Sequence, residues 1–233
     1  DTDEEYIDFR KSDITAEPYE NFLSATCPTA PIARALGRDF PFADADEWRD
    51  LAMCEYYVVA GLSAMGLEPA MEKFFSAEEY NALWSCFNLR QYLQRTASTV
   101  STVPADIASE LLLDLIRTTD GAIDGTNPAK ANLRFGHAET LMPLLSLIRL
   151  KGCYYMTNYF DTVGLHWRDF YVVPMAANLQ MILFKAKRSG RYYLRVDLNE
   201  TPVPLQPNST KLYISWPDAR MYLTRCLPLD KQP

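Results

Sequence analysis

The chain has 233 residues, of which 48% are hydrophobic and 12% aromatic, so its composition is that of a folded protein and excludes a disordered one. Lys and Arg number 23 against 30 Asp and Glu, and the net charge of -7 argues against a nucleic-acid partner, which basic surfaces bind. No apolar run approaches the roughly 18 residues of a membrane span. The five cysteines are scattered and include no C-x-x-C pair of the kind that binds zinc.

The first 125 residues are predicted to be mostly helical. From Asp46 to Leu62, apolar side chains recur at spacings of three and four residues, with Asp44 and Asp46 as candidate N-caps. Ser76 and Glu79 have the spacing of a capping box, in which each satisfies a backbone N–H at the start of a helix. These apolar stripes are interpreted as core-facing surfaces.

A further helix is predicted after Pro104, which suits a first helical turn. Its apolar face consists of Ile107, Leu111, Leu115 and Ile116. The helix is expected to stop near Gly121, since glycine is common just beyond a helix end. The stretch from Gly121 to Pro128 combines Asp-Gly and Asn-Pro, which is typical of a loop.

From residue 126 to residue 233 the pattern changes to mixed α and β. The predicted strands are Ala131–Phe135, Leu179–Ala186, Tyr192–Leu198 and a short edge strand at Thr201–Leu205. The predicted helices are Glu139–Leu150 and Asp218–Cys226. A turn at residues 188–190 joins two of the strands into a hairpin. This organisation fits either one α/β unit with a helical insertion or two abutting domains.

Two histidines, His137 and His166, limit any chemistry that needs imidazole. His137 lies where a predicted strand ends and a helix begins, a place where free backbone N–H groups and the helix dipole favour anions. Gly136 lets the backbone approach a ligand closely, and Glu139 could protonate a leaving oxygen. Taken alone, the pattern is an anion-site candidate, because a turn histidine and a first-turn glutamate also occur for structural reasons.

The run from Phe135 to Leu141 reads Phe-Gly-His-Ala-Glu-Thr-Leu and is followed by Pro-Leu-Leu at residues 143–145. It closely resembles the second signature of the multiple inositol polyphosphate phosphatases. These form a branch of the histidine acid phosphatase family in which His-Ala-Glu stands where most members have His-Asp. The segment from Arg195 to Glu200 also resembles the family's C-terminal strands. The resemblance is firm from about Ala131 onward and looser before it.

The resemblance implies an α/β fold, with the C-terminal part of a three-layer histidine-phosphatase domain at 126–233 and a mostly helical α domain at 1–125. It implies an enzyme that removes phosphates from inositol hexakisphosphate and lower inositol polyphosphates. The reaction would pass through a phosphohistidine, with no metal and no cofactor. It also implies a location in the periplasm, outside the cell or in the secretory lumen.

Residue by residue, the matching motif implies that Glu139 is the proton donor to the leaving oxygen. His137 would bind the transferred phosphoryl group, with the backbone at Ala138 also facing the substrate. Arg134, on the opposite side of the predicted strand from Phe135, could meet a substrate phosphate through two parallel hydrogen bonds. A surface ion pair is an equally good interpretation of Arg134.

The family's first motif, Arg-His-Gly, carries the phosphate-accepting histidine, and it does not occur in this chain. The segment from Gly164 to Arg168 around His166 does not match it. The motif is therefore expected on an N-terminal segment or a separate chain, as in a cleaved or split enzyme or a longer polypeptide. A noncatalytic descendant is the third explanation. The retained proton donor favours the first two.

Two other functions stay open. One is a noncatalytic module that binds inositol phosphates, and the other is an acid phosphatase for another small ester such as a sugar phosphate. Two further features have ordinary interpretations. The basic residues around the hairpin tip suit a solvated turn, and the aromatic residues before Trp167 suit packing or a pocket wall.

Overall fold

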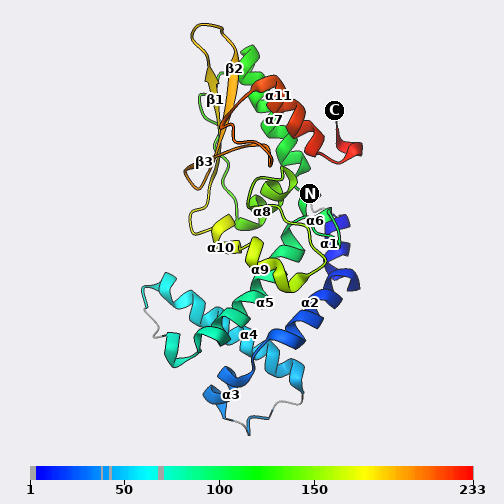
Figure 1. The fold of residues 1–233 in the computed structure, drawn as a ribbon, viewed down its shortest axis with the longest axis vertical. Helices are drawn as coiled ribbons and strands as arrows, with labels where there is room; N and C mark the ends of the chain where they lie inside the picture. The colour runs from blue at the N-terminus through cyan, green and yellow to red at the C-terminus, as the bar shows by residue number, and fades with distance from the viewer. Residues whose placement is uncertain (1–3, 38, 42–43, 68–70, 233) are drawn as a thin grey trace.

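The computed structural model describes residues 4–37, 39–41, 44–67 and 71–232 and combines helices with one antiparallel sheet. The helices before residue 125 are α1 (Glu4–Lys11), α2 (Asp13–Thr26), α3 (Ala30–Leu36), α4 (Ala45–Leu62), α5 (Ala77–Arg95), α6 (Val103–Asp106) and α7 (Ser109–Asp124). The later elements are α8 (Ala138–Leu147), α9 (Val163–His166), α10 (Asp169–Val172), β1 (Leu179–Lys185), β2 (Tyr192–Leu198), β3 (Thr201–Val203), β4 (Tyr213–Ser215) and α11 (Trp216–Cys226). The helices α3 and α4 lie at one end of the long axis and the β1–β2 hairpin at the other (Figure 1).

Helices α4 and α5 begin as their capping residues predict. The backbone N–H groups of Asp46 and Glu47 donate to Asp44 Oδ1 at 2.9 and 3.0 Å, so Asp44 caps α4 and Asp46 lies in its first turn. At α5, Ser76 Oγ accepts from the Glu79 N–H at 3.2 Å, and a Glu79 carboxylate oxygen accepts from the Ser76 N–H at 2.8 Å. The predicted capping box is therefore confirmed.

The helix expected after Pro104 differs in two ways from the prediction. It is split into α6 and α7, and α7 continues past Gly121 to Asp124. Gly125, with φ of +87°, adopts the left-handed conformation that ends the helix. Gly121 is instead a packing position, since an added Cβ would lie 3.1 Å from Thr126 Oγ1, where the chain folds back over the helix.

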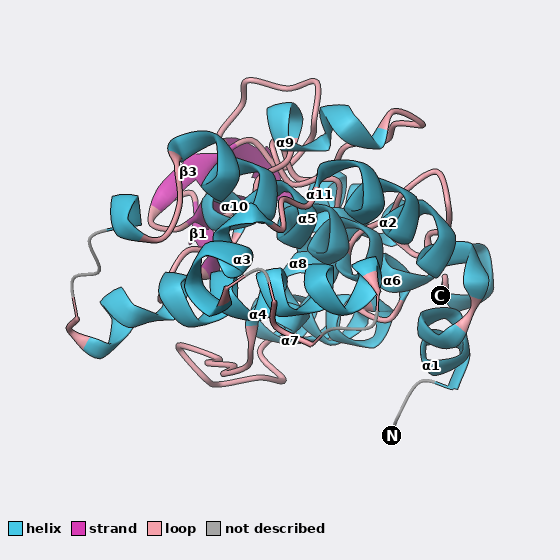
Figure 2. Ribbon diagram, turned by 90° about the horizontal axis from the view of Figure 1, so that it is seen from below, coloured by secondary structure: helices cyan, strands magenta, loops and turns pink. Residues whose placement is uncertain are grey.

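The sheet is built around β2, which pairs on one side with β1 and on the other with both β3 and β4, always antiparallel. The β1–β2 register runs from Leu179 opposite Leu198 to Lys185 opposite Tyr192, as the predicted hairpin requires. Figure 2 shows the strands confined to one region of an otherwise helical molecule. The short strand β4 was not predicted, and α11 begins two residues before the predicted Asp218 because Ser215 caps it.

Two clusters of buried side chains form the core, and α5 belongs to both. The smaller cluster joins the start of α5 to α2 and α4 through Leu23, Met53, Tyr56, Leu83 and Cys86. The larger one joins the end of α5 to α7, α8, β2 and α11 through Leu93, Leu112, Leu145, Leu194 and Leu223. Helix α5 therefore connects the helical end of the molecule to the sheet end. The domain boundary expected at residue 125 stays a prediction.

The described part of the chain contains no helix that is long and apolar enough to cross a bilayer. All five thiols are free of disulfide bonds in the structure: Cys27, Cys54, Cys86, Cys153 and Cys226.

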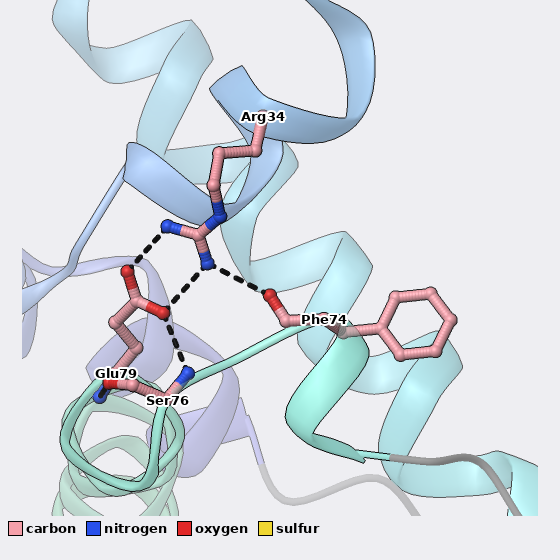
Figure 3. A network of polar contacts seen from close by, with 4 residues as sticks. All are labelled: Arg34, Phe74, Ser76 and Glu79. Carbon is pink, nitrogen blue, oxygen red and sulfur yellow. Dashed lines mark hydrogen bonds and ion pairs between the residues drawn. The ribbon is translucent and has the colours of Figure 1, made fainter.

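The start of α5 is held by a polar network that the capping box shares with α3 (Figure 3). The Arg34 guanidinium donates two hydrogen bonds of 2.8 Å to the two carboxylate oxygens of Glu79, and a third of 3.0 Å to the Phe74 carbonyl. The Arg34 hydrogen bonds lower the pKa of Glu79 to about 2, and the Ser76 N–H adds to this effect. The network thus ties the α3 segment to the first turn of α5.

We expect the substitution Ser76→Ala to lower the free energy of unfolding by about 1 kcal/mol, because the Glu79 N–H loses its acceptor. Urea unfolding followed by circular dichroism measures the change. Ser85→Ala is the control, since Ser85 bonds within its own helix to the Asn81 carbonyl. A loss no larger than the control's would contradict the capping role.

The network also predicts a dependence of stability on pH. The pKa of Glu79 in the folded chain lies below its ordinary value of 4.5, so the stabilisation is present above about pH 4.5 and is lost as the pH falls toward about 2. The unfolding midpoint of the wild type should therefore fall more between pH 5 and pH 3 than that of Glu79→Gln. Parallel curves for the two proteins would exclude a contribution from this pair.

Candidate functional site

The start of α8 carries the tripeptide His137-Ala138-Glu139 at the protein surface. His137 is the N-cap residue, with extended backbone, and its carbonyl accepts from the Thr140 N–H at 2.9 Å. None of the described residues hydrogen-bonds the His137 imidazole, and both His137 and Glu139 are exposed. Two side chains that could serve an anion therefore lie at one helix end that is open to solvent.

Gly136 precedes this helix end in a turn that leaves little space. A Cβ at Gly136 would lie 3.2 Å from Thr140 Oγ1, closer than ordinary van der Waals contact. The glycine lets the chain bend tightly against the first turn of α8. The close approach is to Thr140 of the same helix end, the φ of Gly136 is not in the left-handed region, and the approach of a ligand to this glycine stays a prediction.

The strand predicted at Ala131–Phe135 is not formed, and this prediction is wrong for the chain as described. Residues 131–137 have no regular secondary structure, and the described sheet pairs only β1 to β4. Arg134 bonds to Asp114 of α7, while its neighbours Leu133 and Phe135 are 77% and 93% exposed. A strand needs a neighbour to accept and donate its backbone hydrogen bonds, and the described part of the chain offers this segment none.

Arg134 forms the ion pair that was one of its two interpretations. Its Nε donates to Asp114 Oδ2 at 3.0 Å, its Nη2 pairs with the same oxygen, and Nη2 also donates to Thr118 Oγ1 at 3.1 Å. The guanidinium is thus held on α7. Binding of a substrate phosphate by Arg134 stays a prediction.

A different arginine, Arg95 at the last residue of α5, lies beside the tripeptide. Its Nη2 is 3.8 Å from Glu139 Oε1, and its Nη1 donates to the hydroxyl of Tyr6 on α1. The Arg95 side chain is only 15% exposed, whereas that of Glu139 is 48% exposed. Sequence reasoning missed Arg95, because the only signal was a basic residue in a last helical turn, where the helix dipole favours a cation anyway.

The position of Arg95 is set by a direct bond between α5 and α8. The Ala97 N–H, just beyond the end of α5, donates to the buried Ser146 hydroxyl of α8 at 2.9 Å. Thr96 Oγ1 also donates to the Tyr92 carbonyl at 2.8 Å and closes the last turn of α5. The end of α5 is therefore held against the last turn of α8, and the Arg95 side chain comes within 3.8 Å of Glu139 in the first turn of α8, a place that we call the junction.

The remaining candidates lie away from this junction. His166 stacks on Tyr155, with ring centroids 4.5 Å apart. Trp167 is fully buried in the core, and its carbonyl accepts from Asn88 Nδ2 at 3.0 Å. Of the aromatic residues before it, Tyr154 and Tyr155 pack against the core, and Phe160 both packs there and lines a cavity. A cavity of about 500 Å³ lies among α1, α2, α4 and α5. A second cavity, of about 570 Å³, lies between α5 and residues 160–170. Neither cavity is lined by His137 or Glu139.

Comparison with protein families gives a match to the histidine phosphatase superfamily (branch 2) over residues 9–199. Among curated proteins, multiple inositol polyphosphate phosphatase 1 of Gallus gallus is 27% identical over 159 residues, which are 64% of this chain and 35% of the relative. The Homo sapiens protein of the same name is 26% identical over 156 residues, 62% of this chain and 32% of the relative. The chain thus spans about a third of the length of these relatives.

Among solved structures, the chain resembles the multiple inositol polyphosphate phosphatase of Bifidobacterium longum, crystallised with phosphate. The TM-score is 0.63 at 22% identity, and the match covers 79% of this chain and 42% of that one. At this identity the likeness concerns the fold. The expected α/β, histidine-phosphatase-like fold is therefore confirmed.

Proposed function

Because the chain belongs to the histidine phosphatase superfamily (branch 2), we propose that it supplies the proton-donating half of a phosphatase that acts on inositol polyphosphates. The observation that carries the proposal is the His-Ala-Glu tripeptide at the solvent-exposed start of α8, with Arg95 beside Glu139. The names of the curated relatives support inositol polyphosphates as the class of substrate, and within that class we propose inositol hexakisphosphate and lower inositol polyphosphates.

The proposed chemistry needs a nucleophile, an acid and positive charge. A histidine in an Arg-His-Gly motif on another segment or chain attacks phosphorus, and Glu139 gives a proton to the inositol oxygen, which is a poor leaving group without it. His137 and the free N–H groups at the start of α8 stabilise the negative charge on the phosphoryl oxygens. Glu139 then acts as the base that activates water against the phosphohistidine.

The segment of residues 131–136, which we call the unpaired segment, is the proposed contact for the part of the enzyme with Arg-His-Gly. Arg134 ties this segment to α7, and its neighbours Leu133 and Phe135 are open to solvent. A strand added there would satisfy the backbone groups and cover both apolar side chains, as in β-strand addition. It would also bring the nucleophile to the residues that follow the segment.

Two rival functions make different predictions about the native material. A noncatalytic module that binds inositol phosphates would contain no polypeptide with Arg-His-Gly, whereas the proposed phosphatase must contain one. Intact masses and an inventory of every polypeptide in the native protein decide between binding and catalysis. Phosphate release from inositol hexakisphosphate, a sugar phosphate and other small esters separates an inositol polyphosphate phosphatase from a general acid phosphatase. For location we propose the periplasm, the exterior or the secretory lumen.

The complete protein should lose activity when Glu139 is replaced by Gln, which keeps the shape but has no proton to give. We expect turnover of inositol hexakisphosphate to fall by roughly a hundredfold or more, while the affinity for the substrate changes little. Phosphate release and equilibrium binding measure the two quantities. Glu110→Gln, in the first turn of α7, is a matched control. Equal turnover of the two variants would reject Glu139 as the proton donor.

The unpaired segment gives a further prediction. Phe135→Asp would place a charge where an apolar contact is proposed. The complete protein should therefore have lower phosphatase activity and a lower melting temperature. Met65→Asp is the control, because Met65 is also an apolar side chain, 74% exposed, at the helical end. If both variants melt and turn over alike, the unpaired segment is not the contact.

A further inference from the structure

Two Arg–Glu pairs in the described part of the chain each contain a glutamate in the first turn of a helix. Only one of these two pairs is hydrogen-bonded. Arg34 and Glu79 form two hydrogen bonds of 2.8 Å in the first turn of α5, although the Arg34 side chain is half exposed (Figure 3). Arg95 and Glu139, in the first turn of α8, are separated by 3.8 Å. Arg95 is thus more buried than Arg34, but its contact with the carboxylate of its glutamate is longer.

Only part of the Arg95 guanidinium is hydrogen-bonded to described residues. Its Nη1 donates to Tyr6, while its buried Nε has no acceptor among the described residues. A buried donor without an acceptor costs free energy, and a buried cation costs more, so a purely structural role explains this arrangement poorly. Charge-assisted hydrogen bonds to carboxylates are about 2.7–2.9 Å long, so a shift of about 1 Å would complete the pair with Glu139.

We propose that Arg95 is a positioning residue for Glu139: it orients and stabilises the Glu139 carboxylate that forms when the proton passes to the leaving oxygen. This inference rests on the proposed function. Arg95 suits the role because the junction between α5 and α8 fixes its backbone, and Tyr6 fixes one end of its guanidinium. Glu139 accepts no hydrogen bond from any other described residue, so its second oxygen stays available to the substrate.

The charge change at Glu139 follows from the two proposed steps. As the histidine of the partner segment bonds to phosphorus, the bond between phosphorus and the inositol oxygen breaks. Its electron pair stays on that oxygen, which takes the Glu139 proton and leaves a carboxylate facing Arg95. In the second step the carboxylate takes a proton from water as the water oxygen bonds to phosphorus, and the histidine leaves. Arg95 stabilises the form of Glu139 that links the two steps.

The test compares Arg95→Met, Arg95→Lys and the matched control Arg34→Met in the complete protein. On inositol hexakisphosphate, Arg95→Met should lower kcat by roughly tenfold or more with little change in KM. Arg95→Lys should recover part of the loss because it retains the charge. Arg34→Met removes an arginine from the other first-turn pair and should leave kcat unchanged.

Pre-steady-state kinetics with p-nitrophenyl phosphate separate positioning from folding. Its phenolate leaves without a proton, so Arg95→Met should still release a rapid burst of nearly one p-nitrophenol per enzyme, followed by slow turnover as the phosphohistidine waits for water activation. A misfolded variant would instead give a reduced burst and normal turnover per active site, which would overturn the inference. A raised KM at constant kcat would also overturn it, because Arg95 would then bind the substrate.

The same experiment keeps the two proposals apart. An active wild type together with a fully active Arg95→Met would overturn the role of Arg95 and leave the proposed function standing. A complete wild-type protein that releases phosphate from neither substrate would overturn the proposed function and the inference with it.

Discussion

The hydrogen bond from the Ala97 N–H to the Ser146 hydroxyl is the contact on which the geometry of the site depends. It holds the end of α5 against the last turn of α8, and from there the Arg95 side chain comes within 3.8 Å of Glu139 in the first turn of α8. A helix C-terminus favours a cation and a helix N-terminus favours an anion. Arg95 is a cation at the C-terminus of α5, and Glu139 is an acidic residue in the first turn of α8. The junction thus determines the electrostatic surroundings of the proposed proton donor.

Helix α5 carries this junction because it is fixed at its start and along its length. The network of Arg34, Glu79 and Ser76 sets its first turn against α3. Halfway along, the buried Asn88 side chain donates to the Trp167 carbonyl and accepts from the Asp169 N–H at 2.9 Å, so one residue satisfies two backbone groups of the second half. Both core clusters then pack on α5. The helix that ends at Arg95 is therefore packed against both parts of the core.

The region in front of α8 contrasts with this well-bonded interior. Leu133 and Phe135 are open to solvent, while Arg134 between them is bonded to α7. These two apolar side chains directly precede the His-Ala-Glu tripeptide, which is why the unpaired segment is the proposed contact for the part of the enzyme with Arg-His-Gly. The chain spans about a third of the length of its curated relatives.

The sequence by itself determined the features that depend on near neighbours in the chain. The Ser76–Glu79 capping box, the β1–β2 hairpin and the His-Ala-Glu signature follow from residues a few positions apart, and their local geometry needs no distant partner. Gly121 was mistaken for a helix end because only packing against Thr126 distinguishes it from Gly125. The tertiary structure alone decided that Arg134 pairs with Asp114, that residues 131–135 stay unpaired, and that Arg95 faces Glu139. The two ion pairs join residues far apart in the chain, and the missing strand pairing depends on whether a distant strand lies beside the segment. No local pattern specifies which distant group will satisfy a charge or a backbone N–H.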